Sequence, residues 1–253
     1  MNDTGTIVFA VCGKGGVGKT TVSAALTRFL GADEEKTVLA IDADPAIGLA
    51  TALGFTGSKT VDGIRLELID GLERGQTGAK EDLAQQLDYD VFAAIEEREN
   101  LSFLAIGRPE KEGCYCKVNS LLRDIIGSIA ANYDYVVIDG EAGIEQVNRR
   151  VMERVSHLIV VSDLSAKGIG VAETIAAVSA DAVHFEKAGL IINRVRDDHE
   201  LSMVRLPAGL PVLGWLPESD NVRTTDMRGG NIYDINDVAL FERLRACLQG
   251  LGI

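Results

Sequence analysis

The sequence predicts a doubly wound α/β fold, in which helices cover both faces of a mostly parallel sheet of about seven or eight strands. Three observations support this prediction. Short apolar runs alternate with longer segments of helical periodicity, a glycine-rich turn joins the first run to the first helix, and 27 of the 253 residues are glycine while only 5% are aromatic. No internal repeat or low-complexity linker divides the chain, so we expect one domain over residues 1–253.

The expected strands are apolar runs bounded by turn residues, as in strands that are buried on both faces. They cover residues 6–11, 37–41, 101–106, 135–138, 157–162, 188–192 and 210–216, and a further short strand is expected at 64–69. Helices are expected at residues 20–30, 79–87, 118–130, 168–180 and 234–248. The last helix has an apolar stripe but few basic residues on its polar face, which favours packing against the sheet over membrane binding.

Composition excludes several classes of function. Acidic residues outnumber basic residues 38 to 25, and the formal net charge is -13. Nucleic acid would be repelled by this charge, so it is not an expected partner. The N-terminus has no basic segment followed by an apolar core, and no apolar run approaches the roughly 18 residues of a membrane span. We therefore expect a cytoplasmic protein without a membrane anchor.

A phosphate-binding loop is predicted between the first strand and the first helix. Residues 13–20 fit the pattern G-x-x-x-x-G-K-[ST] in the strand–loop–helix context that this pattern requires. Glycines let backbone N–H groups converge on phosphate oxygens, and a lysine adds a positive charge. The expected phosphate-binding residues are Gly13, Gly15, Gly16, Val17, Gly18, Lys19, Thr20 and Thr21. The Thr20 hydroxyl is expected to bind Mg²⁺. The alternative is a glycine-rich turn that fits the pattern by accident, and the strand and helix expected on either side of the loop disfavour it.

Three carboxylates follow two of the expected strands. Asp42 and Asp44 leave the strand at 37–41, and Asp139 ends the strand at 135–138. Ligands of open α/β sheets bind at the carboxyl edge of the strands, so these side chains are expected to act on Mg²⁺, its waters and the attacking water. The structural alternative for Asp42 and Asp44 is a simple turn after a strand.

The sequence Cys114-Tyr115-Cys116 predicts a second site. In an extended segment, residues i and i+2 project to the same side, so both sulfurs could approach one ion. A disulfide within so short a loop would be strained. Two thiolates do not complete a four-coordinate shell, but the same segment from two chains related by a two-fold axis would supply four sulfurs to a thiophilic ion such as Ni²⁺ or Zn²⁺. Alternatively, Cys114 and Cys116 are small buried hydrophobic residues.

The base of the nucleotide is expected to meet the end of the strand at 188–192. GTPases carry N-K-x-D at this place, where the aspartate binds guanine, but here the fourth position is Arg196. Adenine is therefore preferred, and the expected ligand is ATP or ADP. The three histidines, His157, His184 and His199, show no metal-ligand spacing and are expected to be structural or solvated.

The segment Gly13-Lys14-Gly15-Gly16-Val17-Gly18-Lys19-Thr20-Thr21 resembles the signature of the deviant Walker A ATPases, which include nitrogenase iron protein and the septum-positioning and plasmid-partitioning ATPases. The resemblance implies an ATPase that forms a nucleotide-sandwich dimer, with Lys14 reaching the phosphates bound by the partner subunit. It also implies that Asp44 orients the attacking water and that Asn193 contacts the base, while the loop opened by Pro217 closes over it. Switch II in this family commonly follows D-[ST]-x-A-G, whereas this chain has Gly140 and Glu141 after Asp139.

With Cys114 and Cys116, the resemblance narrows to the CooC/AcsF ATPases, which mature nickel-containing carbon monoxide dehydrogenase and acetyl-CoA synthase. It implies an ATP- or metal-dependent homodimer that binds Ni²⁺ between subunits, and a nickel enzyme as client. Two alternatives remain open. Four cysteines could instead hold a [4Fe–4S] cluster in an electron-transfer ATPase, or the protein could be a metal-free positioning ATPase.

Overall fold

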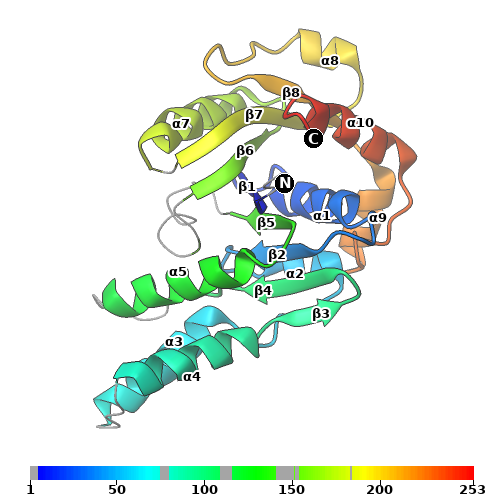
Figure 1. Ribbon diagram of the computed structural model, residues 1–253. Coiled ribbons are helices and arrows are strands. Elements are labelled where there is room, and N and C mark those ends of the chain that lie inside the picture. The colour runs from blue at the N-terminus through cyan, green and yellow to red at the C-terminus, as the bar shows by residue number, and fades with distance from the viewer. Residues whose placement is uncertain (1–4, 75–79, 109–115, 141–150, 152–153, 183) are drawn as a thin grey trace.

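The computed structural model describes residues 5–74, 80–108, 116–140, 151, 154–182 and 184–253. Eight strands form one sheet in the order β3-β4-β2-β5-β1-β6-β7-β8 (Figure 1). The strands are β1 (Ile7–Gly13), β2 (Val38–Asp42), β3 (Glu96–Arg98), β4 (Leu101–Ala105), β5 (Tyr135–Asp139), β6 (Arg154–Ser162), β7 (His184–Val195) and β8 (Val212–Pro217).

Helices cover both faces of this sheet (Figure 1). They are α1 (Lys19–Leu30), α2 (Gly48–Leu53), α3 (Val61–Glu73), α4 (Lys80–Phe92), α5 (Cys116–Ala130), α7 (Ala166–Ala182), α8 (Asp198–Ser202), α9 (Asp220–Met227) and α10 (Val238–Gln249). All strand pairs are parallel except the pair of β3 with β4, which is antiparallel at one edge. The predicted doubly wound α/β fold is confirmed.

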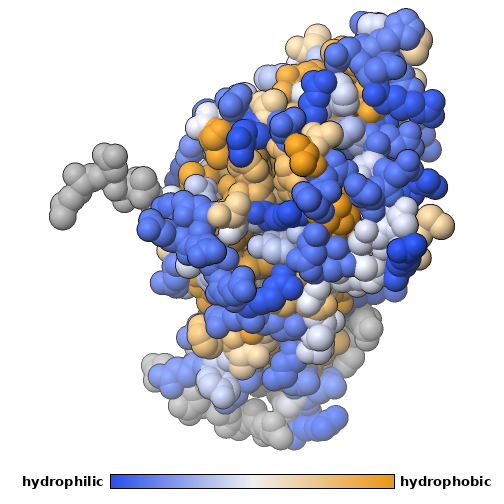
Figure 2. Space-filling model, turned by 90° about the vertical axis from the view of Figure 1, so that its right-hand side faces the viewer, coloured by the Kyte–Doolittle hydropathy of each residue, from blue (hydrophilic) through white to orange (hydrophobic). Residues whose placement is uncertain are grey.

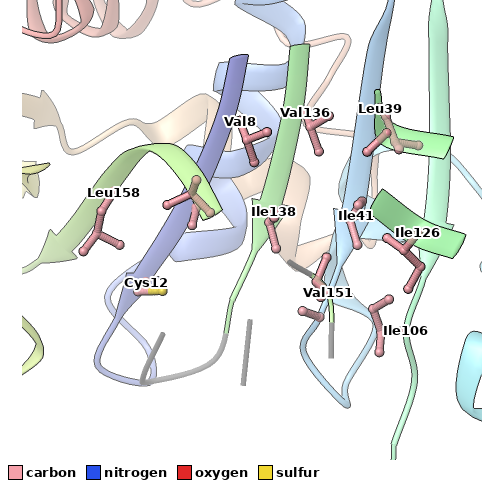
Figure 3. Packing of buried hydrophobic residues seen from close by; sticks show 14 of the residues in the cluster. Val8, Cys12, Leu39, Ile41, Ile106, Ile126, Val136, Ile138, Val151 and Leu158 are labelled. Atoms are coloured by element: carbon pink, nitrogen blue, oxygen red, sulfur yellow. The ribbon is translucent and has the colours of Figure 1, made fainter. Parts of the chain in front are cut away.

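Successive residues of the central strand β1 point to opposite faces of the sheet and therefore belong to two different hydrophobic clusters. Val8, Ala10 and Cys12 belong to the cluster that lies under α3, α4, α5 and α7. Figure 3 shows Cys12 on the same face of the sheet as the apolar residues Ile138 and Leu158 of the two neighbouring strands. Phe9 and Val11 point to the opposite cluster, under α1, α2 and α10. Because both faces are covered, the strand has to be apolar throughout.

Strand β1 ends at a point where only glycine fits. At Gly13 the backbone has φ 156, and a Cβ atom would lie 2.2 Å from the carbonyl oxygen of Val161 in β6. Close pairing of β1 with β6 thus depends on the missing side chain.

Two predictions about the elements are corrected. Residues 64–69, predicted as a strand, lie within helix α3, where Val61, Ile64 and Ile69 are buried. Their spacing is helical, and the Thr60 hydroxyl accepts a hydrogen bond from the Gly63 N–H at 3.0 Å near the start of the helix. The edge strand β3 was not predicted because its sequence, Glu-Glu-Arg, carries no apolar alternation.

The C-terminal helix packs against the sheet, as predicted. Leu240, Leu244 and Leu248 of α10 are buried in the cluster that also contains residues of α1 and β8. The side of the molecule seen in Figure 2 is mostly hydrophilic, with apolar residues between the hydrophilic ones. Among the described residues, no helix is both long and apolar enough to cross a membrane.

We predict that Gly13→Ala lowers the free energy of unfolding by about 1–3 kcal/mol, because the new methyl group would clash with the Val161 carbonyl. Urea denaturation measures this change. The matched control is Gly15→Ala in the same loop, where an added Cβ meets nothing within 4 Å. Equal stabilities of the two variants would contradict the close approach of β1 to β6.

Candidate functional site

The carboxyl edge of the sheet brings the predicted site residues together. Asp42 and Asp139 are register partners of the parallel pair β2–β5, and Asp139 is also the register partner of Val11 in β1. The Ala43 N–H donates to the Asp139 carbonyl at 2.9 Å, which ties the two strand ends together. Two carboxylates therefore lie beside the loop that follows β1.

Asp139 is buried and only partly satisfied. It is 1% exposed, and its Oδ1 accepts a hydrogen bond from the Ser23 hydroxyl at 2.9 Å. Its Oδ2 has no hydrogen-bond partner within the described part of the chain. Burial raises the pKa of Asp139 to about 6, while Thr20, Ser23 and Lys19 act in the opposite direction. An unpartnered carboxylate oxygen next to Thr20 fits a Mg²⁺ ion, which would supply the charge that stabilises the phosphates.

Ser23 is a site residue that the sequence analysis missed. It is completely buried and lies one turn after Thr20 on α1. The sequence feature that could have identified Ser23 is a hydroxyl side chain three residues after Thr20, on the same face of the expected helix. Only its contact with Asp139 distinguishes it from an ordinary core serine.

Asp42 holds the loop that carries Asp44. Its Oδ1 accepts from the Asp44 N–H at 3.0 Å and its Oδ2 from the Leu49 N–H at 2.8 Å. Burial, followed by the charge of Asp139, raises the pKa of Asp42 to about 7. Asp42 therefore has the turn-forming role that the sequence analysis gave as the structural alternative. A contact between Asp42 and Mg²⁺ stays a prediction.

Asp44 is half-buried and also forms a local turn. Its Oδ1 accepts from the Ala46 N–H at 2.9 Å. The second carboxylate oxygen has no hydrogen bond among those described for this loop. Asp44 lies on the same edge as Asp42, Asp139 and the phosphate loop, as expected, and its role in orienting water stays a prediction.

The phosphate loop ends in an uncapped helix. Gly18 is the N-cap residue of α1 with φ 92, no side chain caps the helix, and its first turn contains no acidic residue. The free N–H groups and the helix dipole make this end an anion site. Lys19 is 8% exposed as the first residue of the helix, and Lys14 is half-buried in the loop.

A cavity of about 300 Å³ lies next to the loop, within the range of small-ligand pockets. The predicted base residues Asn193 and Pro217 line it, together with Thr21 from α1. The Asn193 side chain is 5% exposed, and its Nδ2 donates to the Val17 carbonyl at 2.9 Å. The structure thus brings together the residues expected to bind the base, and their contact with adenine stays a prediction.

The cysteine pair falls mainly outside the described residues. Cys114 lies outside them, and Cys116 is the first residue of α5, two positions before the expected helix start at Val118. The expectation that both cysteines share an extended segment is therefore not confirmed. Among residues that the structure describes, no group of three or more His, Cys, Asp or Glu side chains could hold a metal ion. Glu141 and most of switch II also lie outside them.

The remaining thiols and histidines among the described residues are either buried or exposed at the surface. Cys12 and Cys247 are buried free thiols, and burial raises the pKa of Cys12 to about 12. His157 is 7% exposed and stacks on Phe9 with 5.0 Å between ring centroids. His184 and His199 are exposed. His157 thus packs in the core, whereas His184 and His199 face solvent.

A glycine-rich loop before an uncapped helix, carboxylates at neighbouring strand ends and an adjacent base pocket define a P-loop nucleotide-binding protein. The chain matches the CobQ/CobB/MinD/ParA nucleotide binding domain over residues 8–232. It belongs to this family and is an ATPase.

Several curated proteins match most of this chain. The chain is 35% identical to an uncharacterized ATP-binding protein of Methanocaldococcus jannaschii, over 90% of this chain and 91% of the relative. It is 29% identical to the carbon monoxide dehydrogenase accessory protein CooC of Rhodospirillum rubrum, over 90% and 89%. It is 31% identical to a putative septum site-determining protein MinD of Mesostigma viride, over 90% and 76%.

Solved structures share the fold at low sequence identity. MinD of Pyrococcus horikoshii complexed with Mg-ADP has a TM-score of 0.62 at 20% identity, with 97% of this chain and 96% of that chain covered. A complex of a McdA variant from Cyanothece with ATP has a TM-score of 0.69 at 18% identity, with 98% and 97% covered. These structures support the architecture alone.

We predict that Ser23→Ala destabilises the Mg²⁺-free protein by about 2 kcal/mol at about pH 8 and by less at about pH 5. The pKa of Asp139 is raised to about 6 in the folded state, so ionisation of this carboxyl lowers the unfolding free energy as the pH rises through that value. The Ser23 hydrogen bond offsets part of this loss only while Asp139 is charged. Denaturation at both pH values measures the difference, and an equal cost at both would contradict it.

We predict that Asp44→Asn keeps ADP affinity but lowers kcat for ATP hydrolysis by roughly 10²- to 10⁴-fold, because a neutral amide orients the attacking water less strongly than a carboxylate and cannot take its proton. Phosphate release under saturating ATP measures kcat. The control is Asp33→Asn, an exposed turn residue whose carboxylate accepts from the Glu35 N–H at 3.1 Å. Hydrolysis at the wild-type rate would exclude Asp44 as the water-orienting residue.

Proposed function

We propose that this protein is a cytoplasmic, ATP-hydrolysing metallochaperone that binds a divalent metal, Ni²⁺, between two subunits and assists nickel insertion into carbon monoxide dehydrogenase or acetyl-CoA synthase. The observation that carries the proposal is the sequence Cys114-Tyr115-Cys116. Two such segments, one from each chain, supply the four sulfurs that a thiophilic ion requires. Nickel is here the cargo of the protein.

The elements on either side of the cysteine pair in the chain support this proposal. Strand β4 comes before the pair and α5 begins at its second cysteine, and β4 pairs with β2, whose end carries Asp42. Cys116 is the first residue of α5. Since β2 and β4 are parallel, the chain leaves β4 at the sheet edge that carries the nucleotide site.

The nucleotide cycle would change the metal site through the subunit interface. Lys14 is half-buried in the phosphate loop of its own chain and would bind the phosphates of the partner subunit. Gly140 follows the Mg²⁺ candidate Asp139 and donates its N–H to the Val11 carbonyl at 2.9 Å, so switch II starts from a fixed point beside the phosphate loop. ATP binding draws the subunits together, and hydrolysis assisted by Asp44 lets them separate and release the ion.

A second candidate function is a metal-free positioning ATPase. The relative MinD of Mesostigma viride is as similar to this chain as CooC is, with 31% identity against 29%. The cysteine pair is the feature of this chain that favours the metallochaperone over the positioning ATPase. A direct test of metal binding therefore decides between the two.

We predict that the anaerobically purified protein binds about one Ni²⁺ per two chains and that the double variant Cys114→Ser/Cys116→Ser loses this binding. Equilibrium dialysis gives the stoichiometry, and gel filtration with and without ATP and Ni²⁺ gives the oligomeric state. Cys247→Ser serves as control, since this thiol is buried against β8. It should bind Ni²⁺ like the wild type.

Three outcomes would contradict the proposal. Metal binding that survives the double substitution would remove its basis. A visible absorption band with stoichiometric sulfide would indicate a [4Fe–4S] cluster instead. ATP-dependent dimers that bind no Ni²⁺ would favour the positioning ATPase.

A further inference from the structure

Two successive residues at the end of β7 hold two successive carbonyls of the phosphate loop. The Asn193 Nδ2 donates to the Val17 carbonyl at 2.9 Å, and the Arg194 Nη1 donates to the Gly16 carbonyl at 3.0 Å. The next carbonyl, that of Gly18, accepts the N–H of Val22 at 3.0 Å as the first bond of α1. Three consecutive loop carbonyls therefore have partners inside the protein.

These contacts determine which way the loop presents its N–H groups. In a planar trans peptide, the C=O and the N–H point in opposite directions. A donor on the Gly16 carbonyl therefore turns the Val17 N–H away from Arg194, and a donor on the Val17 carbonyl does the same for the Gly18 N–H. Backbone N–H groups of this loop are the groups that bind phosphate oxygens.

The Asn193 side chain lies close to the backbone of Gly18. A Cβ atom at Gly18 would lie 2.3 Å from the Asn193 Nδ2, so no other residue would let the amide reach the loop. Asn193 is itself fixed, because its Oδ1 accepts the N–H of Arg194 at 3.0 Å.

The backbone of Arg194 has a strained conformation. Its φ is 62, in the left-handed region that favours glycine. The strain lies at an irregularity of the β7–β8 pairing between Ile192 and Val195. A residue kept in this region at an energetic cost points to a functional constraint.

We infer that Asn193 and Arg194 form a clamp that positions the phosphate loop for the ATPase reaction, with Arg194 as a positioning residue outside the phosphate-binding signature. Both residues also line the cavity expected to hold the base. The clamp therefore connects the base end of the nucleotide site directly to its phosphate end. This role is independent of metal binding by the cysteines.

The test compares ADP affinity with stability in variants of Arg194. Arg194→Ala leaves the Gly16 carbonyl without its donor, and we expect ADP to bind roughly five- to tenfold more weakly. The KM for ATP should rise by the same factor while kcat changes less. Arg194→Lys, which keeps a donor, should recover most of the affinity. Isothermal titration calorimetry with ADP and Mg²⁺ measures binding.

Arg194→Gly separates positioning from a purely structural role. Glycine tolerates the positive φ, so the melting temperature without nucleotide should be higher than that of Arg194→Ala, yet ADP affinity should fall as in Arg194→Ala. The control is Arg196→Ala, which removes an exposed side chain paired with Glu200 and Glu218 and should change neither quantity. ADP affinity within about twofold of the wild type for Arg194→Ala, or unchanged affinity for Arg194→Gly, would overturn the inference.

Discussion

The nucleotide site of this protein depends on the burial of two carboxylates beneath the phosphate loop. Asp42 is fully buried and Asp139 is 1% exposed, and burial raises the pKa of both. Charged groups in such places require partners, because the protein interior solvates them poorly. The partners are backbone N–H groups for Asp42 and Ser23 for one oxygen of Asp139. The other Asp139 oxygen is available to a cation.

The phosphate loop supplies the groups that bind an anion. It is built from backbone groups whose carbonyls are engaged by β7 and by the first turn of α1, which leaves the N–H groups and Lys19 to face an anion. Carboxyl groups at two strand ends and a loop that carries Lys19 together suit Mg²⁺ and phosphate. Parallel pairing of β1, β2 and β5 in register brings the carboxyl groups and the loop to one edge of the sheet.

Patterns that depend on neighbours in the chain were predicted well. The apolar runs that became buried strands, and the glycine-rich loop between β1 and α1, are local features. The predictions failed where the local pattern was ambiguous or absent. Residues 64–69 are apolar enough for a strand but belong to α3, and the charged strand β3 forms only because it pairs with β4 and because Glu96 accepts N–H groups of Thr56 and Ser58.

The amino-acid pattern alone was sufficient for the fold class, the phosphate loop and the strand ends that bear Asp42, Asp44 and Asp139, because glycine spacing, apolar runs and turn residues act over a few positions. Tertiary structure decided which of these groups meet. Ser23 is 116 positions from Asp139 and Arg194 is 178 from Gly16. No local pattern encodes such contacts, because they arise when strands far apart in the chain pair at one edge of the sheet.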